Sequence, residues 1–127
     1  MREAQAVFRD RGSRFIGLVF HLGAEQDFPA LLERVRKEFP AARHYCYAGR
    51  LRNGHVRSSD DGEPAGTAGR PILNQITAGD LCDVAVIVVR YFGGTLLGKG
   101  GLINAYRSAT VMALEAAGSE QRYVMTE

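Results

Sequence analysis

Hydrophobic and polar residues follow two different periods along this chain, and the changes between them mark the expected elements. Residues 83–92 (DVAVIVVRYF) form an apolar run rich in β-branched side chains, which predicts a buried strand. Two weaker strand patterns at 4–8 and 14–22 flank turn residues at 10–13, which predicts a β-hairpin. An Asn-Gly pair at 53–54 indicates a second hairpin.

The stretch 42–51 (ARHYCYAGRL) precedes that pair and is expected to be a strand. Successive side chains of a strand point to opposite faces. The alternation therefore predicts that Tyr45 and Tyr47 share one face, and that His44 and Cys46 share the other.

Three helices are expected. Residues 25–39 and 102–117 carry apolar residues at helical spacing, and Gly118 is a natural C-cap for the second. The apolar stripe of that helix is predicted to consist of Ala105, Ala109, Met112, Ala113 and Ala116. Between these helices, acidic residues followed by Pro64 favour a helix start, while Pro71 indicates a kink or a later start.

The element order is β-hairpin, helix, strands, helix, strand, helix. It predicts an α+β fold, a two-layer sandwich in which a mixed sheet carries its helices on one face. A weak pattern at Tyr123 and Val124 is compatible with one more short strand.

Composition describes an ordinary globular domain. The chain has 127 residues, of which 46% are hydrophobic and 24% charged, so a single domain over residues 1–127 is expected. A net charge of +2 does not by itself indicate nucleic-acid binding. The longest apolar run is too short to span a membrane, and the N-terminus lacks the apolar core of a signal peptide. Cys46 and Cys82 form no framework, so a reduced cytoplasmic protein is expected.

The segment 90–107 (RYFGGTLLGKGGLINAYR) contains the most distinctive motif. Gly93, four residues, Gly98 and Lys99 match a P-loop except that Gly100 stands where the hydroxyl that binds magnesium is needed. No hydrophobic strand ending in Asp follows. ATP or GTP hydrolysis is therefore not expected, and neither is a nucleotide cofactor.

A weaker interpretation is an anion site. Glycines let backbone amides approach a ligand, and the N-terminus of the following helix is electropositive. Nucleic-acid phosphate is the first anion to consider, and the alternative is that the glycines only permit a tight crossover. The binding candidates in this segment are Arg90, Tyr91, Phe92, Gly93, Gly94, Gly98, Lys99, Gly100, Gly101 and Arg107.

A second group of candidates surrounds the acidic run 57–73 (RSSDDGEPAGTAGRPIL). It consists of His44, Asp60, Asp61, Glu63 and Thr67. A Cys46 nucleophile with His44 as its base is disfavoured because side chains two apart on a strand are too distant for a hydrogen bond. The acidic run lacks the ligand spacing of an EF-hand loop, and helix capping explains it more simply than a metal does.

Basic residues are also dense between 43 and 57, with two tyrosines among them. Aromatic and arginine side chains on a sheet can bind single-stranded RNA. A tyrosine pair on one strand face is more often part of a core.

Three segments together carry a family resemblance: 43–50 (RHYCYAGR), 57–73 and 83–106 (DVAVIVVRYFGGTLLGKGGLINAY). They resemble the ancient domain of the IMPACT/YigZ family over nearly the whole chain. The positions that match its motifs are His44, Cys46, Asp60, Asp61, Gly62, Glu63, Pro64, Gly66, Thr67, Gly69, Arg90, Tyr91, Phe92, Gly93, Gly94, Gly98, Gly100 and Gly101.

The resemblance implies an α+β sandwich similar to the second domain of a small-subunit ribosomal protein. It implies no catalytic reaction and no cofactor. Eukaryotic members bind the activator of a starvation-sensing kinase, and nucleic-acid binding has been proposed for bacterial ones. Bacterial members usually carry a ferredoxin-like C-terminal domain, which is expected to be absent from this chain.

The chain departs from the family pattern at four positions: Tyr45, Gly49, Leu96 and Lys99. The family commonly has Thr at position 99 and often a basic residue at position 96. The P-loop likeness is therefore accidental. Relative to the family pattern, the positive charge of the loop lies at position 99 and not at position 96.

Three functions follow from these observations. The first is a non-enzymatic regulatory domain linked to translation, which binds RNA or a ribosome-associated partner through the loop at 93–101. The second is a protein-interaction module that regulates a stress-response kinase pathway or its bacterial counterpart. The third is an enzyme that uses Asp60, Asp61, Glu63 and His44 around a metal or small substrate.

Overall fold

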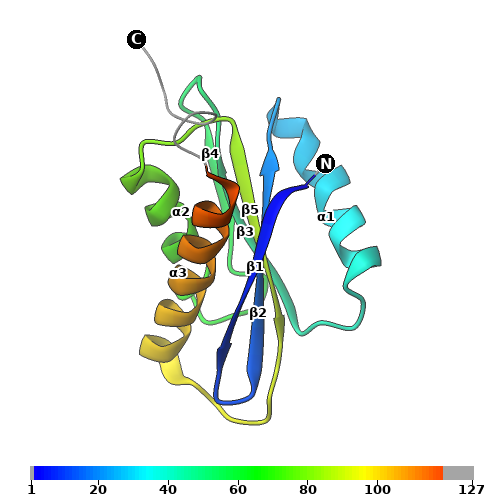
Figure 1. Ribbon diagram of the computed structural model, residues 1–127, viewed down its shortest axis with the longest axis vertical. Helices are drawn as coiled ribbons and strands as arrows, with labels where there is room; N and C mark the ends of the chain where they lie inside the picture. Colours follow the sequence, from blue (N-terminus) through cyan, green and yellow to red (C-terminus); the bar gives the residue numbers. More distant parts are fainter. Residues whose placement is uncertain (1, 119–127) are drawn as a thin grey trace.

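The computed structural model describes residues 2–118 and shows one central sheet with helices on both sides (Figure 1). The strands are β1 (Arg2–Asp10), β2 (Ser13–His21), β3 (His44–Arg50), β4 (Val56–Ser59) and β5 (Val84–Tyr91). The helices are the short 3-10 helix η1 (Glu25–Asp27), α1 (Phe28–Glu38), α2 (Gly69–Ala78) and α3 (Gly98–Ala117). The α+β class is confirmed.

The sheet has the order β1-β2-β5-β3-β4, and every neighbouring pair is antiparallel. The prediction of a mixed sheet was therefore wrong. Helix α1 joins β2 to β3 and α2 joins β4 to β5, and each of these pairs is parallel, but the joined strands are not neighbours. Strand β5 lies between β2 and β3, and β3 lies between β4 and β5, so every hydrogen-bonded pair is antiparallel. The predicted run 83–92 becomes β5, at the centre of the sheet.

The helices cover both faces of the sheet, not one face as predicted. Helix α1 packs on one side, against side chains such as Leu18 and Ile87, while α2 and α3 pack on the other, against Val19 and Val88 (Figure 1). Consecutive residues of β2 and β5 point to opposite faces. Since nearly all of these residues are apolar, both faces of the two strands are apolar. An uninterrupted apolar strand requires cover on both sides, so the sequence already contained this signal.

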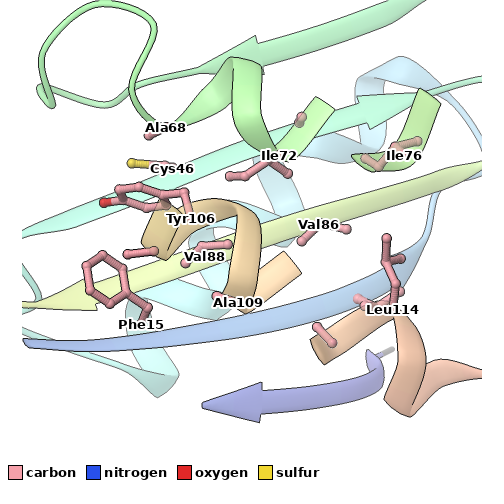
Figure 2. Close-up of a cluster of buried hydrophobic side chains, with 14 of the residues drawn as sticks. Phe15, Cys46, Ala68, Ile72, Ile76, Val86, Val88, Tyr106, Ala109 and Leu114 are labelled. Atoms are coloured by element: carbon pink, nitrogen blue, oxygen red, sulfur yellow. The ribbon is translucent and has the colours of Figure 1, made fainter. Parts of the chain in front are cut away.

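Figure 2 shows the core on the α2/α3 side. Side chains from the three central strands, including Phe15, Cys46 and Val88, face α2 and α3. Tyr106 of α3 is fully buried among them, and its ring meets that of Phe15 edge to face with the centroids 5.1 Å apart. The predicted partition of β3 is confirmed, because Cys46 belongs to this core while Tyr45 and Tyr47 pack on the α1 side.

Two helix predictions need refinement. Helix α2 begins at Gly69 with Pro71 in its first turn. Of the two alternatives, a kink at Pro71 or a later helix start, the later start is therefore correct. Helix α3 begins at Gly98 and ends at the predicted C-cap Gly118, which is left-handed. Its buried side includes Ala105, Ala109 and Ala113 as expected, but Met112 and Ala116 are exposed. The predicted strand at Tyr123 and Val124 lies outside the described residues.

The loop between β5 and α3 is fixed against the turn between β1 and β2 (Figure 1). A side chain at Gly93 would collide with the backbone of Gly12, so only glycine permits this approach. The Gly93 amide also donates to Ser13 Oγ at 3.1 Å. This contact sets where α3 starts relative to the end of the sheet.

Candidate functional site

A pocket of about 290 Å³ lies where the start of β3, the acidic loop before α2, the end of β5 and the first turn of α3 meet. We call it the β5–α3 pocket. Its lining residues are Arg43, His44, Glu63, Pro64, Arg90, Phe92, Leu96, Leu97, Gly98, Lys99 and Leu102. Segments more than fifty residues apart in the sequence therefore build a single cavity.

Glu63 is the centre of a buried polar network in the wall of this pocket. Its side chain is only 3% exposed. Oε2 accepts hydrogen bonds from Arg90 Nη1 at 2.8 Å and from the Tyr106 hydroxyl at 2.5 Å. Burial, together with the neighbouring Cys46 and Glu63, raises the pKa of Tyr106, so this hydroxyl stays protonated and donates. The carboxylate thus holds β5 and α3 together.

Arg90 is the cation of this network and is 5% exposed. Besides Glu63, it contacts Ser13 Oγ through Nη2 at 3.4 Å, and its guanidinium lies near the rings of Phe15 and Phe92. Its Nε is buried and has no hydrogen-bond partner among the described residues. Buried donors are nearly always paired, so this exception marks the pocket wall as unusual.

His44 connects the acidic loop to the same network. Its Nδ1 lies 2.7 Å from the carbonyl oxygen of Asp61, which can only accept, so Nδ1 carries a proton. Its Nε2 lies 3.5 Å from Glu63 Oε1. Only the doubly protonated ring can donate to that carboxylate, because the neutral ring already uses its one proton at Nδ1.

Asp60 organises the start of α2 from outside the helix. Oδ1 accepts the backbone N–H groups of Ala68 and Gly69 at 3.1 and 2.8 Å, and Oδ2 accepts that of Gly66 at 2.9 Å. Burial opposes ionisation, but these three donors outweigh it and lower the pKa of Asp60. The expectation that the acidic run caps a helix is confirmed for this residue.

Asp61 and Thr67 also serve the loop. Asp61 Oδ2 accepts the Tyr45 amide at 2.7 Å, and the Thr67 hydroxyl donates to the carbonyl of Pro64 at 2.6 Å. Neither of them, nor Asp60, lines the pocket. The five candidates of the acidic group are therefore separated: His44 and Glu63 reach the pocket, whereas the other three shape the loop.

Cys46 is a buried core residue. It is 0% exposed, and its Sγ donates to the carbonyl of Asp60 at 3.1 Å. Burial raises the pKa of the Cys46 thiol, which disfavours the thiolate that a nucleophile requires. Within residues 2–118, no three His, Cys, Asp or Glu side chains are grouped so as to hold a metal ion.

The N-terminal end of α3 forms the opposite wall. The N-cap residue is Leu97, whose side chain cannot accept a hydrogen bond. The first amides of a helix have no partner within it, so this end carries partial positive charge. Gly98 and Gly100 leave open space where a side chain would stand, and the exposed Lys99 adds a full charge.

The remaining candidates from the glycine-rich segment have different positions. Phe92 lines the pocket, but Tyr91 points to the α1 side, where its hydroxyl donates to the carbonyl of Pro40 at 3.1 Å. Gly93 and Gly94 belong to the loop before the pocket. Arg107 donates a hydrogen bond to Asn104 at 2.7 Å and does not line the pocket.

Several residues of the site were not among the sequence candidates. Arg43 is exposed, and its guanidinium stacks over the Phe92 ring at 4.5 Å. Tyr106 and Ser13 complete the buried network. A tyrosine in an otherwise aliphatic helix stripe was a usable signal, because a buried hydroxyl needs a partner. Nothing in the sequence pattern separates Arg43 from the other arginines.

A second, larger depression of about 640 Å³ lies on the α1 side. It is lined by Pro29, Leu32, Glu33, Arg36, Lys37 and Arg57. It is more open than the β5–α3 pocket and is lined by surface charges rather than by a buried network. We therefore place the candidate site in the smaller pocket.

Helices long and apolar enough to cross a membrane do not occur within residues 2–118.

Comparison with known proteins agrees with the motifs. Residues 11–114 match the family described as the Impact N-terminal domain. The chain is 40% identical over 119 residues to the IMPACT family member YigZ of Escherichia coli strain K12, covering 91% of this chain and 58% of that protein. The chain thus spans less than two thirds of the length of this relative.

Two solved structures have the same fold. A crystal structure described as that of a hypothetical protein superposes with a TM-score of 0.84 at 40% identity, covering 88% of this chain and 56% of the other. The two-domain translational regulator Yih1 superposes with a TM-score of 0.55 at 28% identity, covering 94% of this chain and 46% of that one. The match over residues 11–114, together with the 40% identity to YigZ, shows that the chain belongs to the IMPACT N-terminal domain family.

Proposed function

We propose that this domain acts in the regulation of translation by binding RNA, and that RNA phosphates bind at the N-terminal end of α3 beside Lys99 and Arg43. The observation that carries the proposal is an open helix end in a pocket with cations on its rim. Helix N-termini bind phosphate because their unpaired amides and the helix dipole both favour an anion.

The charges of the pocket support an anionic ligand. Three cationic side chains line it, Arg43, Lys99 and Arg90, against the single carboxylate of Glu63. Because Arg90 already neutralises Glu63, Arg43 and Lys99 remain available to a ligand. Arginine stacked on an aromatic ring is also a common surface for nucleic-acid bases.

The link to translation comes from a relative. Yih1, which shares the fold at 28% identity, is a translational regulator. RNA suits both observations. It is the main component of the translation machinery, and it offers the phosphates and unpaired bases that a small basic pocket can bind.

Fluorescence anisotropy with a short single-stranded RNA tests the proposal. Phosphate contacts release counterions, so affinity should fall with salt, with a slope of about −0.7 in log–log form for each contact on a single strand. Lys99→Ala should weaken binding and reduce that slope by about 0.7. The matched control is Lys37→Ala, which removes the other lysine in the sequence, on the α1 side.

The expected result is loss of affinity in Lys99→Ala with no change in Lys37→Ala. Binding that is independent of salt, or that Lys37→Ala weakens more strongly, would contradict the proposal. No binding to single-stranded or duplex RNA would also contradict it.

A protein partner is the second candidate, and one observation favours it. Leu96, at the edge of the pocket, is 83% exposed. An exposed apolar side chain beside a pocket suits a protein interface. A purified protein partner whose binding is lost in Leu96→Ser, with no RNA binding by the wild type, would favour the second candidate.

A further inference from the structure

We infer that the β5–α3 pocket is a site for a single nucleotide unit, with the phosphate at the start of α3 and the base against Phe92, so that the domain also binds free nucleoside monophosphates. This inference rests on the proposed RNA-binding function and assigns a ligand to the pocket itself. It goes further than binding along a basic surface, for which no pocket would be needed.

The size of the pocket sets the first limit. Its volume of about 290 Å³ is just below the range of about 300–1,000 Å³ that is usual for small-molecule sites. Such a cavity suits one small ligand or one unit of a polymer. The rest of an RNA strand would continue outside it.

The two walls of the pocket differ in chemistry. Phe92, Leu97 and Leu102 make one part apolar, while Gly98 and Lys99 present amides and a charge. A nucleotide has the same division, because its base is a flat ring and its phosphate is an anion. A simple inorganic anion would leave the apolar part empty, and an uncharged ring would leave the cations unpaired.

Arg90 gives independent evidence of a ligand. It is 95% buried, lines the pocket and has an Nε without a hydrogen-bond partner in the described part of the chain. Leaving a buried donor unpaired is unfavourable. Nε is closed off from solvent, so a base carbonyl, a ring nitrogen or a phosphate oxygen reaches it only when side chains of the pocket wall shift. Every nucleotide carries such acceptors.

Base stacking completes the arrangement. The Arg43 guanidinium covers the Phe92 ring at 4.5 Å, and Arg43 itself is exposed. An arginine on an aromatic ring can move aside to admit a base or stack on the outer face of that base, and base–aromatic stacking depends little on sequence. We therefore expect little preference among the four bases.

The experiment is a titration of ¹⁵N-labelled protein, followed by NMR, with uridine monophosphate, uridine and inorganic phosphate in turn. We expect uridine monophosphate to bind at least tenfold more tightly than uridine or phosphate alone. Equal affinity for phosphate would overturn the inference, because the site would then be an anion site only. Equal affinity for uridine would overturn the assignment of the phosphate to α3.

Two variants give a matched comparison. Phe92→Leu should weaken uridine monophosphate binding at least fivefold, whereas Tyr91→Leu changes the neighbouring aromatic residue on the opposite face and should have no effect. Arg43→Ala, at an exposed position, provides a second test if Phe92→Leu perturbs folding. Equal effects at positions 91 and 92 would overturn the inference.

The outcomes separate this inference from the proposed function. RNA binding without uridine monophosphate binding overturns the nucleotide pocket and leaves surface binding of RNA in place. Uridine monophosphate binding without RNA binding supports the pocket and overturns the RNA proposal. Failure of both ligands overturns both.

Discussion

The two sides of the central sheet are built differently. On the α1 side, the core consists of aliphatic and aromatic side chains, such as Leu18, Phe28 and Ile87. On the α2/α3 side, an apolar core of similar kind ends in a buried polar network around Glu63 and Arg90. The buried polar or charged side chains of the described residues all lie on that side: Ser13, Glu63, Thr67, Arg90 and Thr110.

This difference supports the proposed location of the binding site. The α1 side shows that the sheet can be covered with apolar groups alone, so a buried ion pair is not needed for the fold. Replacing buried ion pairs with apolar groups is often neutral or stabilising. A protein that keeps such a pair beside a cavity, with one donor unpaired, is best explained by a binding role.

The largest expected effect is that of Glu63→Ala. The change leaves the Arg90 charge buried without its partner and removes the acceptor of the Tyr106 hydroxyl. Breaking one member of a buried pair costs about 3–5 kcal/mol, so the free energy of unfolding should fall by that amount. Urea denaturation measures it, and a loss below about 1 kcal/mol would contradict the account.

Leu31→Ala is the matched change on the α1 side. Leu31 is 6% exposed in the apolar core, and its truncation should cost about 2–5 kcal/mol. Under conditions where both variants are folded, Glu63→Ala should change RNA affinity, because it alters the charge and the wall of the pocket, while Leu31→Ala should not. If the two variants lost RNA affinity equally, the proposed division between the two sides would fail.

A smaller effect is expected for Asp60→Asn. Asp60 accepts backbone N–H groups at the start of α2 and in the loop before it. Asn has only one accepting oxygen and turns an NH2 group toward these donors, so the change should lower the free energy of unfolding by about 1 kcal/mol at neutral pH. Because the folded state lowers the pKa of Asp60, this stabilisation is fully present above the unfolded pKa near 3.9. It is lost as the pH falls through the lower folded pKa.

The difference between wild type and Asp60→Asn should therefore be constant from about pH 5 to 7 and shrink below about pH 4. Asp80→Asn is a suitable control, because the Asp80 side chain is 65% exposed and its pair with Arg50 lies at the surface. That variant should change stability by no more than about 0.5 kcal/mol. A difference for Asp60→Asn that grows on acidification would contradict the capping role.

Much of the fold follows from the sequence pattern. The alternation of β3, the helical spacing in α1 and the uninterrupted β-branched run of β5 identified these three elements. Strand direction and the side on which each helix packs are set by long-range pairing, which the periods do not encode. Met112 was predicted to face the core but is exposed. Helical spacing shows that α3 has an apolar stripe, but it does not determine which residues at the border of that stripe are buried.

The candidate site was predicted in part. The glycine-rich motif located Phe92, Gly98 and Lys99, which do line the pocket. The candidate Arg107 does not line the pocket, because nearness in sequence to the loop does not determine which side of α3 a residue occupies. Arg43 was missed as a site residue because its relation to Phe92 depends on the pairing of β3 with β5.

The most direct test of the central claim is to map a short single-stranded RNA onto the protein by NMR. The account predicts that backbone amide shifts change at the start of α3, above all at Gly98, Gly100 and Leu102, and at Arg43 beside Phe92. Shifts concentrated instead along the α1 depression, at Arg36 and Arg57, would contradict it.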